Sequence, residues 1–144
     1  MNKKICIITG ANSGIGKAAA VQIMQKGFHV VLACRDQERG EKSRTEINQL
    51  AGDNSSELML VDMSLQSSIH AFSKAFLSKY STLDVLIHNA AAFDVTRKDP
   101  TFTEEGIESI WATNHIGPVL LTDLLIEALK SSEQGRIITI ASKG

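Results

Sequence analysis

The amino-acid sequence predicts an α/β fold, with helices on both faces of a doubly wound parallel sheet. Short apolar runs of strand length alternate with stretches of helical pattern along the 144 residues, and strands joined through helices pair in parallel by right-handed crossovers. Runs such as 30–33 (Val-Val-Leu-Ala) are apolar throughout, which is typical of strands covered on both faces. A glycine-rich turn joins the first strand to the first helix. These observations together predict one domain built from βαβ units.

The alternation of strands and helices runs along the chain. Five strands are expected in apolar, β-branched runs, at residues 3–9, 28–34, 57–61, 83–88 and 136–141. Helices are expected over 14–26, where Gly27 ends the first one, and over the charged stretch 37–51. Ser64 is expected to cap a third helix. The apolar residues of that helix recur on one face: Leu65, Ile69, Phe72 and Phe76.

The segment after the fourth strand is expected to begin as a polar loop over 94–103, which borders a substrate entrance. A helical segment then ends at Trp111, and a separate helix over 114–130 is too apolar all round to face solvent. Trp111 is therefore expected in the core or in a pocket wall. His115 is expected to pack against the sheet.

The composition describes an ordinary soluble protein. Hydrophobic residues make up 43% of the chain and charged residues 22%, with a formal net charge of −1, which excludes a disordered chain and a basic nucleic-acid-binding surface. No apolar run reaches the length of a membrane span, and the histidines and cysteines show no metal-ligand spacing. Cys6 and Cys34 lie in apolar runs and are expected as buried thiols in a reducing, cytoplasmic compartment.

The turn after the first strand has the residues that a dinucleotide-phosphate site requires. Gly10 lets the chain leave the strand at a φ that other residues avoid. Gly14 and Gly16 remove side chains where a pyrophosphate approaches the backbone and where the helix packs on the sheet. The N–H groups of the first helical turn and the positive end of the helix dipole then face the phosphates.

This turn allows two other interpretations. A P-loop requires a glycine five residues before Gly16, where Ala11 lies, and a hydroxyl residue after Lys17, where Ala18 lies. The sequence fails both requirements. A strand-to-helix turn without a ligand is the remaining alternative, and the polar residues at the other strand ends favour the phosphate site over it.

Those polar residues follow the second, third and fourth strands. Arg35 lies where a cation suits the 2′-phosphate of NADP(H) and an acid suits the free hydroxyl of NAD(H), and an arginine can bind phosphate through two parallel hydrogen bonds. Arg35 therefore favours NADP(H). The alternative is a solvated surface arginine that pairs with Asp36. Asp62 can accept a hydrogen bond from an adenine amino group, and the small residue after Asn89 lets the backbone approach the cofactor ribose.

Two further polar residues lie later in the chain. Asn114 falls inside or at the start of an apolar helix, and a buried amide there needs hydrogen-bond partners. It is expected either to support the backbone or to order water near the chemistry. Ser142 lies just beyond the fifth strand.

Together these residues resemble the short-chain dehydrogenase/reductase family, in its compact single-domain branch. The matching motifs are Thr9-Gly10-x-x-x-Gly14-Ile15-Gly16, Asp62, His88-Asn89-Ala90-Ala91, Asn114 and the strand that ends at Ser142. Ala33-Cys34-Arg35-Asp36 and Thr113-Asn114-His115-Ile116-Gly117 are most similar to retinol dehydrogenases and WW-domain-containing oxidoreductases. One departure is Ala91, which stands where the family carries glycine.

The resemblance implies a Rossmann-type sheet and hydride transfer between a nicotinamide and a small-molecule carbonyl or alcohol, with a homodimer in a full-length form. It implies catalytic roles for Asn114 and Ser142. The cofactor-binding residues that it implies are Thr9, Gly10, Asn12, Ser13, Gly14, Ile15, Gly16, Arg35, Asp62, Met63, Asn89 and Ala90.

The resemblance also implies a catalytic tyrosine with a lysine four residues later, because the cation lowers the pKa of the phenol. The only tyrosine, Tyr80, is followed four residues later by Asp84 and is expected to be structural. Residues 1–144 are therefore expected to form an incomplete NAD(P)-binding domain whose sheet stops after the fifth strand.

Two hypotheses about function follow. The chain is either part of an NADP(H)-dependent oxidoreductase, or a catalytically inactive, truncated NADP(H)-binding module with a regulatory role or none. The intact motif residues favour the first. In both cases the fifth strand is expected to be an uncovered, aggregation-prone edge.

Overall fold

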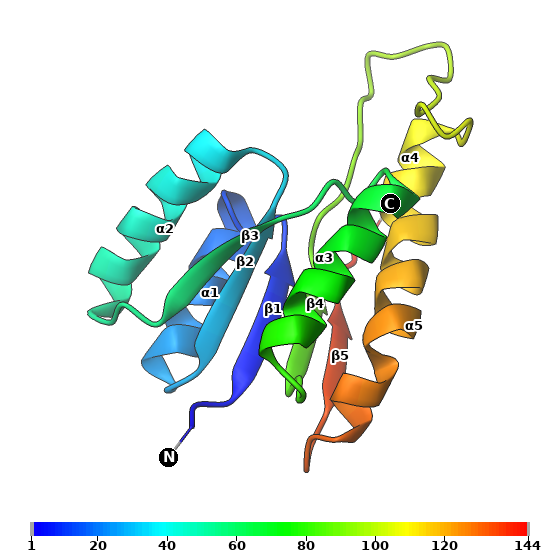
Figure 1. Ribbon diagram of the computed structural model, residues 1–144. Coiled ribbons are helices and arrows are strands. Elements are labelled where there is room, and N and C mark those ends of the chain that lie inside the picture. Colours follow the sequence, from blue (N-terminus) through cyan, green and yellow to red (C-terminus); the bar gives the residue numbers. More distant parts are fainter. Residues whose placement is uncertain (1, 144) are drawn as a thin grey trace.

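The computed structural model describes residues 2–143, and within them five parallel strands form one sheet in the order β3-β2-β1-β4-β5 (Figure 1). The elements are β1 (Ile5–Thr9), α1 (Gly14–Gln25), β2 (His29–Cys34), α2 (Gln37–Ala51), β3 (Ser56–Leu60), α3 (Gln66–Lys79), β4 (Val85–His88), α4 (Ser109–Trp111), the π-helical turn η1 (Ala112–Ile116), α5 (Gly117–Lys130) and β5 (Arg136–Thr139). The predicted doubly wound α/β fold is confirmed.

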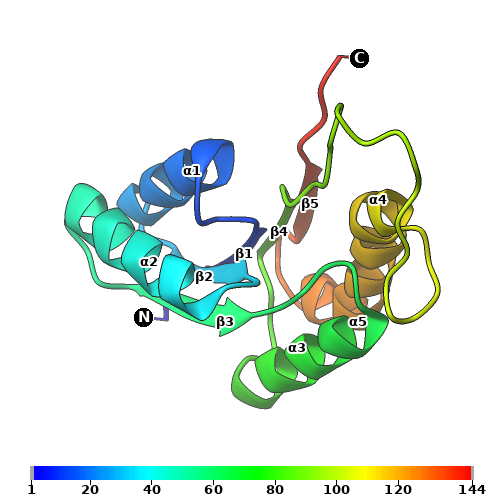
Figure 2. The same cartoon turned by 90° about the horizontal axis from the view of Figure 1, so that it is seen from above.

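Helices cover both faces of the sheet. Figure 2 shows α1 and α2 on one face, and α3 and α5 on the other. The side chains of β1 alternate between the two cores: Cys6 and Ile8 pack with the α1 and α2 side, whereas Ile7 packs with the α3 and α5 side. All three are fully buried, as a parallel sheet covered on both faces requires.

Both cysteines are buried thiols, as predicted. Burial raises the pKa of Cys6 to about 12, with a smaller contribution from the carboxylate of Asp84. Burial likewise raises the pKa of Cys34. Neither thiol is therefore ionised near neutral pH.

The third helix begins differently from the sequence prediction. It starts at Gln66 with Leu65 at the N-cap position, so the predicted cap, Ser64, lies one residue too early and does not accept from the helix. The Ser64 hydroxyl donates to the Asp62 carboxylate at 2.6 Å. The carboxylate of Glu105 takes the cap position and accepts from the backbone N–H groups of Gln66 and Ser67 at 2.6 and 3.0 Å. The prediction failed because the cap comes from a residue far away in the sequence.

The predicted pair of helices after the long loop is one continuous helix, in which α4 passes through η1 into α5. The π turn is closed by a hydrogen bond between residues five apart, from the Gly117 N–H to the Ala112 carbonyl oxygen, and both residues are buried. Trp111 is 54% exposed and stacks on His115, with ring centroids 4.3 Å apart. The expectation that Trp111 lies in the core is wrong, and Trp111 does not line the cavity described below either. His115 is exposed and does not pack on the sheet as expected.

The strand β5 lies at an edge of the sheet, and all four of its residues are exposed. Ile137 and Ile138 remain 45% and 42% exposed, which confirms the predicted uncovered edge. Aggregation through it stays a prediction. Within residues 2–143, no helix combines the length and the apolar character needed to cross a membrane.

Candidate functional site

A cavity of about 550 Å³ lies at the carboxyl ends of the central strands. Its walls come from the segments after β1, β2, β3 and β4, around the point where the chain order of the sheet reverses beside β1. Ligands bind at such a point in open α/β sheets. Ten of the residues predicted to bind a cofactor line the cavity: Gly10, Asn12, Ser13, Gly14, Ile15, Arg35, Asp62, Met63, Asn89 and Ala90.

The glycine turn approaches the chain after β4 very closely. Gly10 has a φ of +63°, and a Cβ there would lie 2.9 Å from the Ala90 Cα. Its N–H donates to the carbonyl oxygen of Ala33 at 2.9 Å, which ties the turn to β2. Gly14 has a φ of +55°, and a Cβ at this residue would meet no atom within 4 Å, so the backbone is open at that point.

Thr9 and Gly16, also predicted to bind cofactor, do not line the cavity but build the turn beneath it. The Thr9 hydroxyl accepts from the N–H groups of Asn89 and Ala90, each at 3.0 Å. The Asn89 side-chain amide donates to the carbonyl oxygen of Gly10 at 3.0 Å. A Cβ on Gly16 would overlap that amide nitrogen and lie 2.7 Å from the Gly10 oxygen.

The first turn of α1 carries backbone N–H groups that no side chain among residues 2–143 accepts from. Its N-cap residue, Ser13, makes no side-chain hydrogen bond to the helix, and the first turn holds no acidic residue. By contrast, Asp36 caps α2 and Glu105 caps α3. Ser13 and Gly14 both line the cavity, so the α1 terminus presents hydrogen-bond donors and a positive dipole end there.

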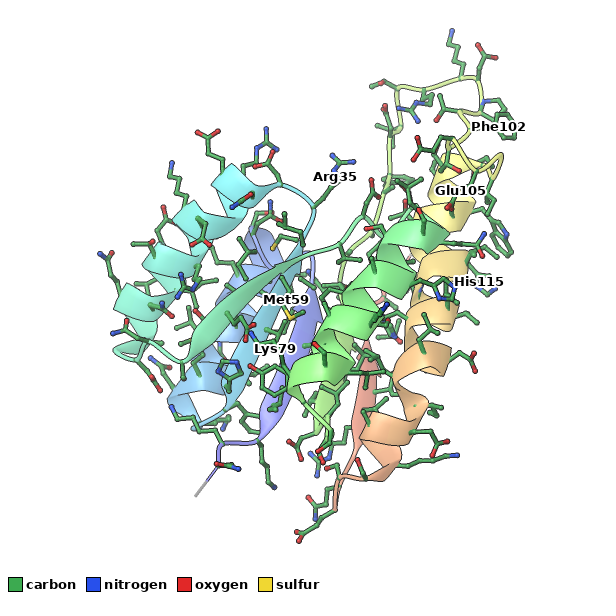
Figure 3. All side chains as sticks on the ribbon, in the orientation of Figure 1. Arg35, Met59, Lys79, Phe102, Glu105 and His115 are labelled. Atoms are coloured by element: carbon green, nitrogen blue, oxygen red, sulfur yellow. The ribbon has the colours of Figure 1, made fainter. Side chains whose placement is uncertain are left out.

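Two arginines line the same cavity, Arg35 from the end of β2 and Arg39 from the first turn of α2. Neither forms an ion pair within the described part of the chain. Asp36 forms no ion pair with Arg35; one oxygen of its carboxylate accepts from the Arg39 backbone N–H at 2.8 Å. Figure 3 shows Arg35 at the upper end of the sheet, pointing away from the core. Sequence reasoning missed Arg39; its position one helical turn after Arg35 was the available signal.

Another wall of the cavity is the turn Asp62–Ser64. One carboxylate oxygen of Asp62 accepts from the backbone N–H and the hydroxyl of Ser64, at 2.9 and 2.6 Å. The Asp62 N–H donates to the Ser68 hydroxyl in α3 at 2.8 Å. The carbonyl oxygen of Met63 lies against Gly117, where a Cβ would overlap it, so this wall also touches the start of α5.

The two predicted catalytic residues lie outside the cavity lining. Asn114, in η1, is exposed rather than buried, and its side chain forms two hydrogen bonds with the backbone of Ala92, at 2.7 and 2.8 Å. It therefore supports the backbone, which is the first of its two predicted roles. Its neighbour Thr113 lines the cavity. Ser142 is exposed beyond the end of β5.

The remaining candidates have structural partners. The Tyr80 hydroxyl donates to the Glu57 carboxylate at 2.6 Å, and burial together with that carboxylate raises the pKa of Tyr80 to about 12. It is structural, as predicted. His88 is buried and bonded through Nε2 to the Thr122 hydroxyl at 2.7 Å, and burial lowers its pKa.

Known proteins resemble this chain in sequence and in fold. The family model for short chain dehydrogenases matches residues 4–144. Dehydrogenase/reductase SDR family member 13 of Homo sapiens is 42% identical over 139 residues, covering 96% of this chain and 36% of that protein. Retinol dehydrogenase 11 of Homo sapiens is 42% identical over 139 residues, covering 96% of this chain and 43% of that protein.

A metagenomic short-chain oxidoreductase solved in complex with NADP has a TM-score of 0.82 and 30% identity. The match covers 98% of this chain and 63% of that one. The chain thus spans about two fifths of the length of the curated relatives named above. The fold, the glycine turn and these matches agree: the chain belongs to the short-chain dehydrogenase family of oxidoreductases.

Proposed function

We propose that the cavity binds NADP(H) in preference to NAD(H), and that the protein containing this chain transfers a hydride between the nicotinamide and a small-molecule carbonyl or alcohol. Residues 1–144 are its nucleotide-binding part. The observation that carries this proposal is one cavity lined by both an uncapped helix terminus and two arginines without ion-pair partners among residues 2–143.

Each group has a distinct task in this proposal. The α1 terminus suits the pyrophosphate, because its N–H groups and dipole favour an anion. Arg35 and Arg39 suit the 2′-phosphate that distinguishes NADP(H) from NAD(H). The Asp62 oxygen that does not bond Ser64 can accept from the adenine amino group. The relative solved with NADP supports this assignment.

When bound, the cofactor would supply or accept the hydride, and the residues named here bind and orient. Asn114 keeps the segment around Ala92 in place through its two hydrogen bonds, and Ala92 lines the cavity. Ser142 is proposed to contact the substrate oxygen. The tyrosine and lysine pair that the family resemblance implies is not among the 144 residues, so turnover is a property proposed for the whole protein.

The test is a titration of the 144-residue chain with NADPH and with NADH, followed by cofactor fluorescence. We expect NADPH to bind at least about ten-fold more tightly, and Arg35→Ala to remove most of that preference, because a charge-assisted hydrogen bond contributes about 1.5–3 kcal/mol. Lys42→Ala is the matched control: it removes an exposed charge from α2 that does not line the cavity. Equal affinity for the two cofactors, unchanged by Arg35→Ala, would refute the NADP(H) preference.

A further inference from the structure

The long loop between β4 and α4 contains a hairpin, residues 101–109, that is held by its own backbone. Phe102 and Glu108 pair as an antiparallel bridge, and the Thr103 N–H donates to the Ile107 carbonyl oxygen at 2.8 Å. Gly106 turns the chain with a φ of +80°. This closed turn carries Glu105 at its tip.

Two glutamates of the hairpin cap two different helices. Glu105 uses both carboxylate oxygens, one for the Gln66 N–H and one for the Ser67 N–H of α3. Glu108 accepts from the Ile110 and Trp111 N–H groups, at 3.1 and 2.8 Å, at the start of α4. Figure 3 shows Glu105 beside the upper end of α3. The hairpin therefore joins the starts of α3 and α4.

Each of these two helices is continuous with a segment that lines the cavity. The wall Asp62–Ser64 leads into α3 and is tied to it by the bond from the Asp62 N–H to Ser68. On the other side, α4 continues into η1, where Thr113 lines the cavity. The contact of Glu105 with α3 therefore connects two segments of the cavity lining that lie far apart in the sequence.

We propose that Glu105 is a positioning residue for the cofactor: by capping α3 it holds the wall Asp62–Ser64 in its binding conformation. The carboxylate satisfies two N–H groups of the first helical turn and adds negative charge at the positive end of the helix dipole. Without it, the first turn of α3 frays, and the bond from Asp62 to Ser68 loosens with it. The binding part of this inference rests on the proposed function; the conformational part does not.

The chain offers matched controls for a test. Glu104 is the adjacent exposed glutamate, and no hydrogen bond or ion pair involves its side chain within residues 2–143. Glu104→Ala therefore removes the same charge without removing the cap. Glu105→Gln keeps an acceptor oxygen but removes the charge.

The first measurement is amide hydrogen exchange of the cofactor-free chain, resolved at Ser64, Gln66 and Ser67. In Glu105→Ala we expect exchange at these amides to accelerate about five-fold, the effect of losing an N-cap, with partial recovery in Glu105→Gln. Glu104→Ala should leave these three amides at the wild-type rate. Wild-type exchange at all three in Glu105→Ala would overturn the proposal.

The second measurement is the dissociation constant for NADPH of the same variants. We expect Glu105→Ala to raise it by the factor by which the fraction of chains with the wall in place falls, which approaches about five-fold where the wall is mostly open in the variant. Glu104→Ala should leave it unchanged. Faster exchange with unchanged NADPH affinity would overturn the positioning role. A wild-type chain that binds no NADPH would instead refute the proposed function, while the exchange rates would still decide whether Glu105 holds the wall.

Discussion

Replacing Gly16 by alanine tests whether the turn beneath the cavity is as closely packed as the distances indicate. The added Cβ would overlap the side-chain nitrogen of Asn89 and lie 2.7 Å from the carbonyl oxygen of Gly10. These two atoms are themselves hydrogen-bonded at 3.0 Å. The methyl group therefore has to break this bond or displace the turn.

The expected destabilisation follows from three contributions. Forcing an extra methyl group into a packed site costs about 1–3 kcal/mol, and leaving the Asn89 amide and the Gly10 carbonyl without each other costs about 1–3 kcal/mol. Alanine gains about 0.5–1 kcal/mol over glycine within a helix, and Gly16 lies in α1. The free energy of unfolding should therefore fall by about 3 kcal/mol, near the middle of these ranges.

The assay is urea unfolding followed by circular dichroism, together with the dissociation constant for NADPH. Gly52→Ala is the control, because Gly52 has a φ of +68° with no neighbouring atom within 4 Å of an added Cβ and lies outside the cavity lining. It should cost about 1–2 kcal/mol of backbone strain and leave NADPH affinity unchanged. Gly16→Ala should weaken NADPH binding by about ten-fold or more, since the turn carries the donors proposed to hold the pyrophosphate.

Asn89→Ala separates the two costs, because it removes the hydrogen bond without adding a methyl group and should cost about 1 kcal/mol. A Gly16→Ala chain with the wild-type midpoint in urea and the wild-type affinity for NADPH would refute the reasoning. So would equal effects of Gly16→Ala and Gly52→Ala on both quantities.

Two further predictions concern buried and half-buried hydroxyls. Thr9→Val keeps the shape of the side chain but leaves two backbone N–H groups without their acceptor, so the free energy of unfolding should fall by about 2–4 kcal/mol; Thr9→Ser should lose much less, and equal urea midpoints for the two variants would contradict the role of the hydroxyl. Burial and the nearby Glu57 raise the pKa of Tyr80 to about 12, so the folded state keeps a proton that the unfolded chain loses above its ordinary pKa near about 10. The resulting stabilisation is complete below about pH 10 and is lost as the pH rises towards about 12. Unfolding free energies measured at about pH 9 and about pH 11 should therefore decline less in Tyr80→Phe than in wild type, and parallel declines would count against it.

The sequence by itself determined the order of the strands and helices and the edge of the sheet that holds the cavity. These features depend on local patterns. Apolar runs such as 30–33 are typical of strands covered on both faces, and the glycines at 10 and 14 have the positive φ values that a direct strand-to-helix turn needs. Arg35 and Asp62 were placed at the cavity for the same reason, since residues that follow parallel strands meet at one edge.

Only the tertiary structure decided which groups satisfy the exposed ends of the helices. The cap of α3 comes from Glu105 rather than Ser64, and the orientation of Trp111 depends on a π turn that the sequence pattern does not reveal. A helix terminus needs an acceptor, but the helix sequence does not specify which residue of the chain provides it. In α3 the acceptor depends on where the hairpin 101–109 packs. Thr9 and Gly16 lie beneath the cavity instead of lining it because they contact the chain after β4, at Asn89 and Ala90.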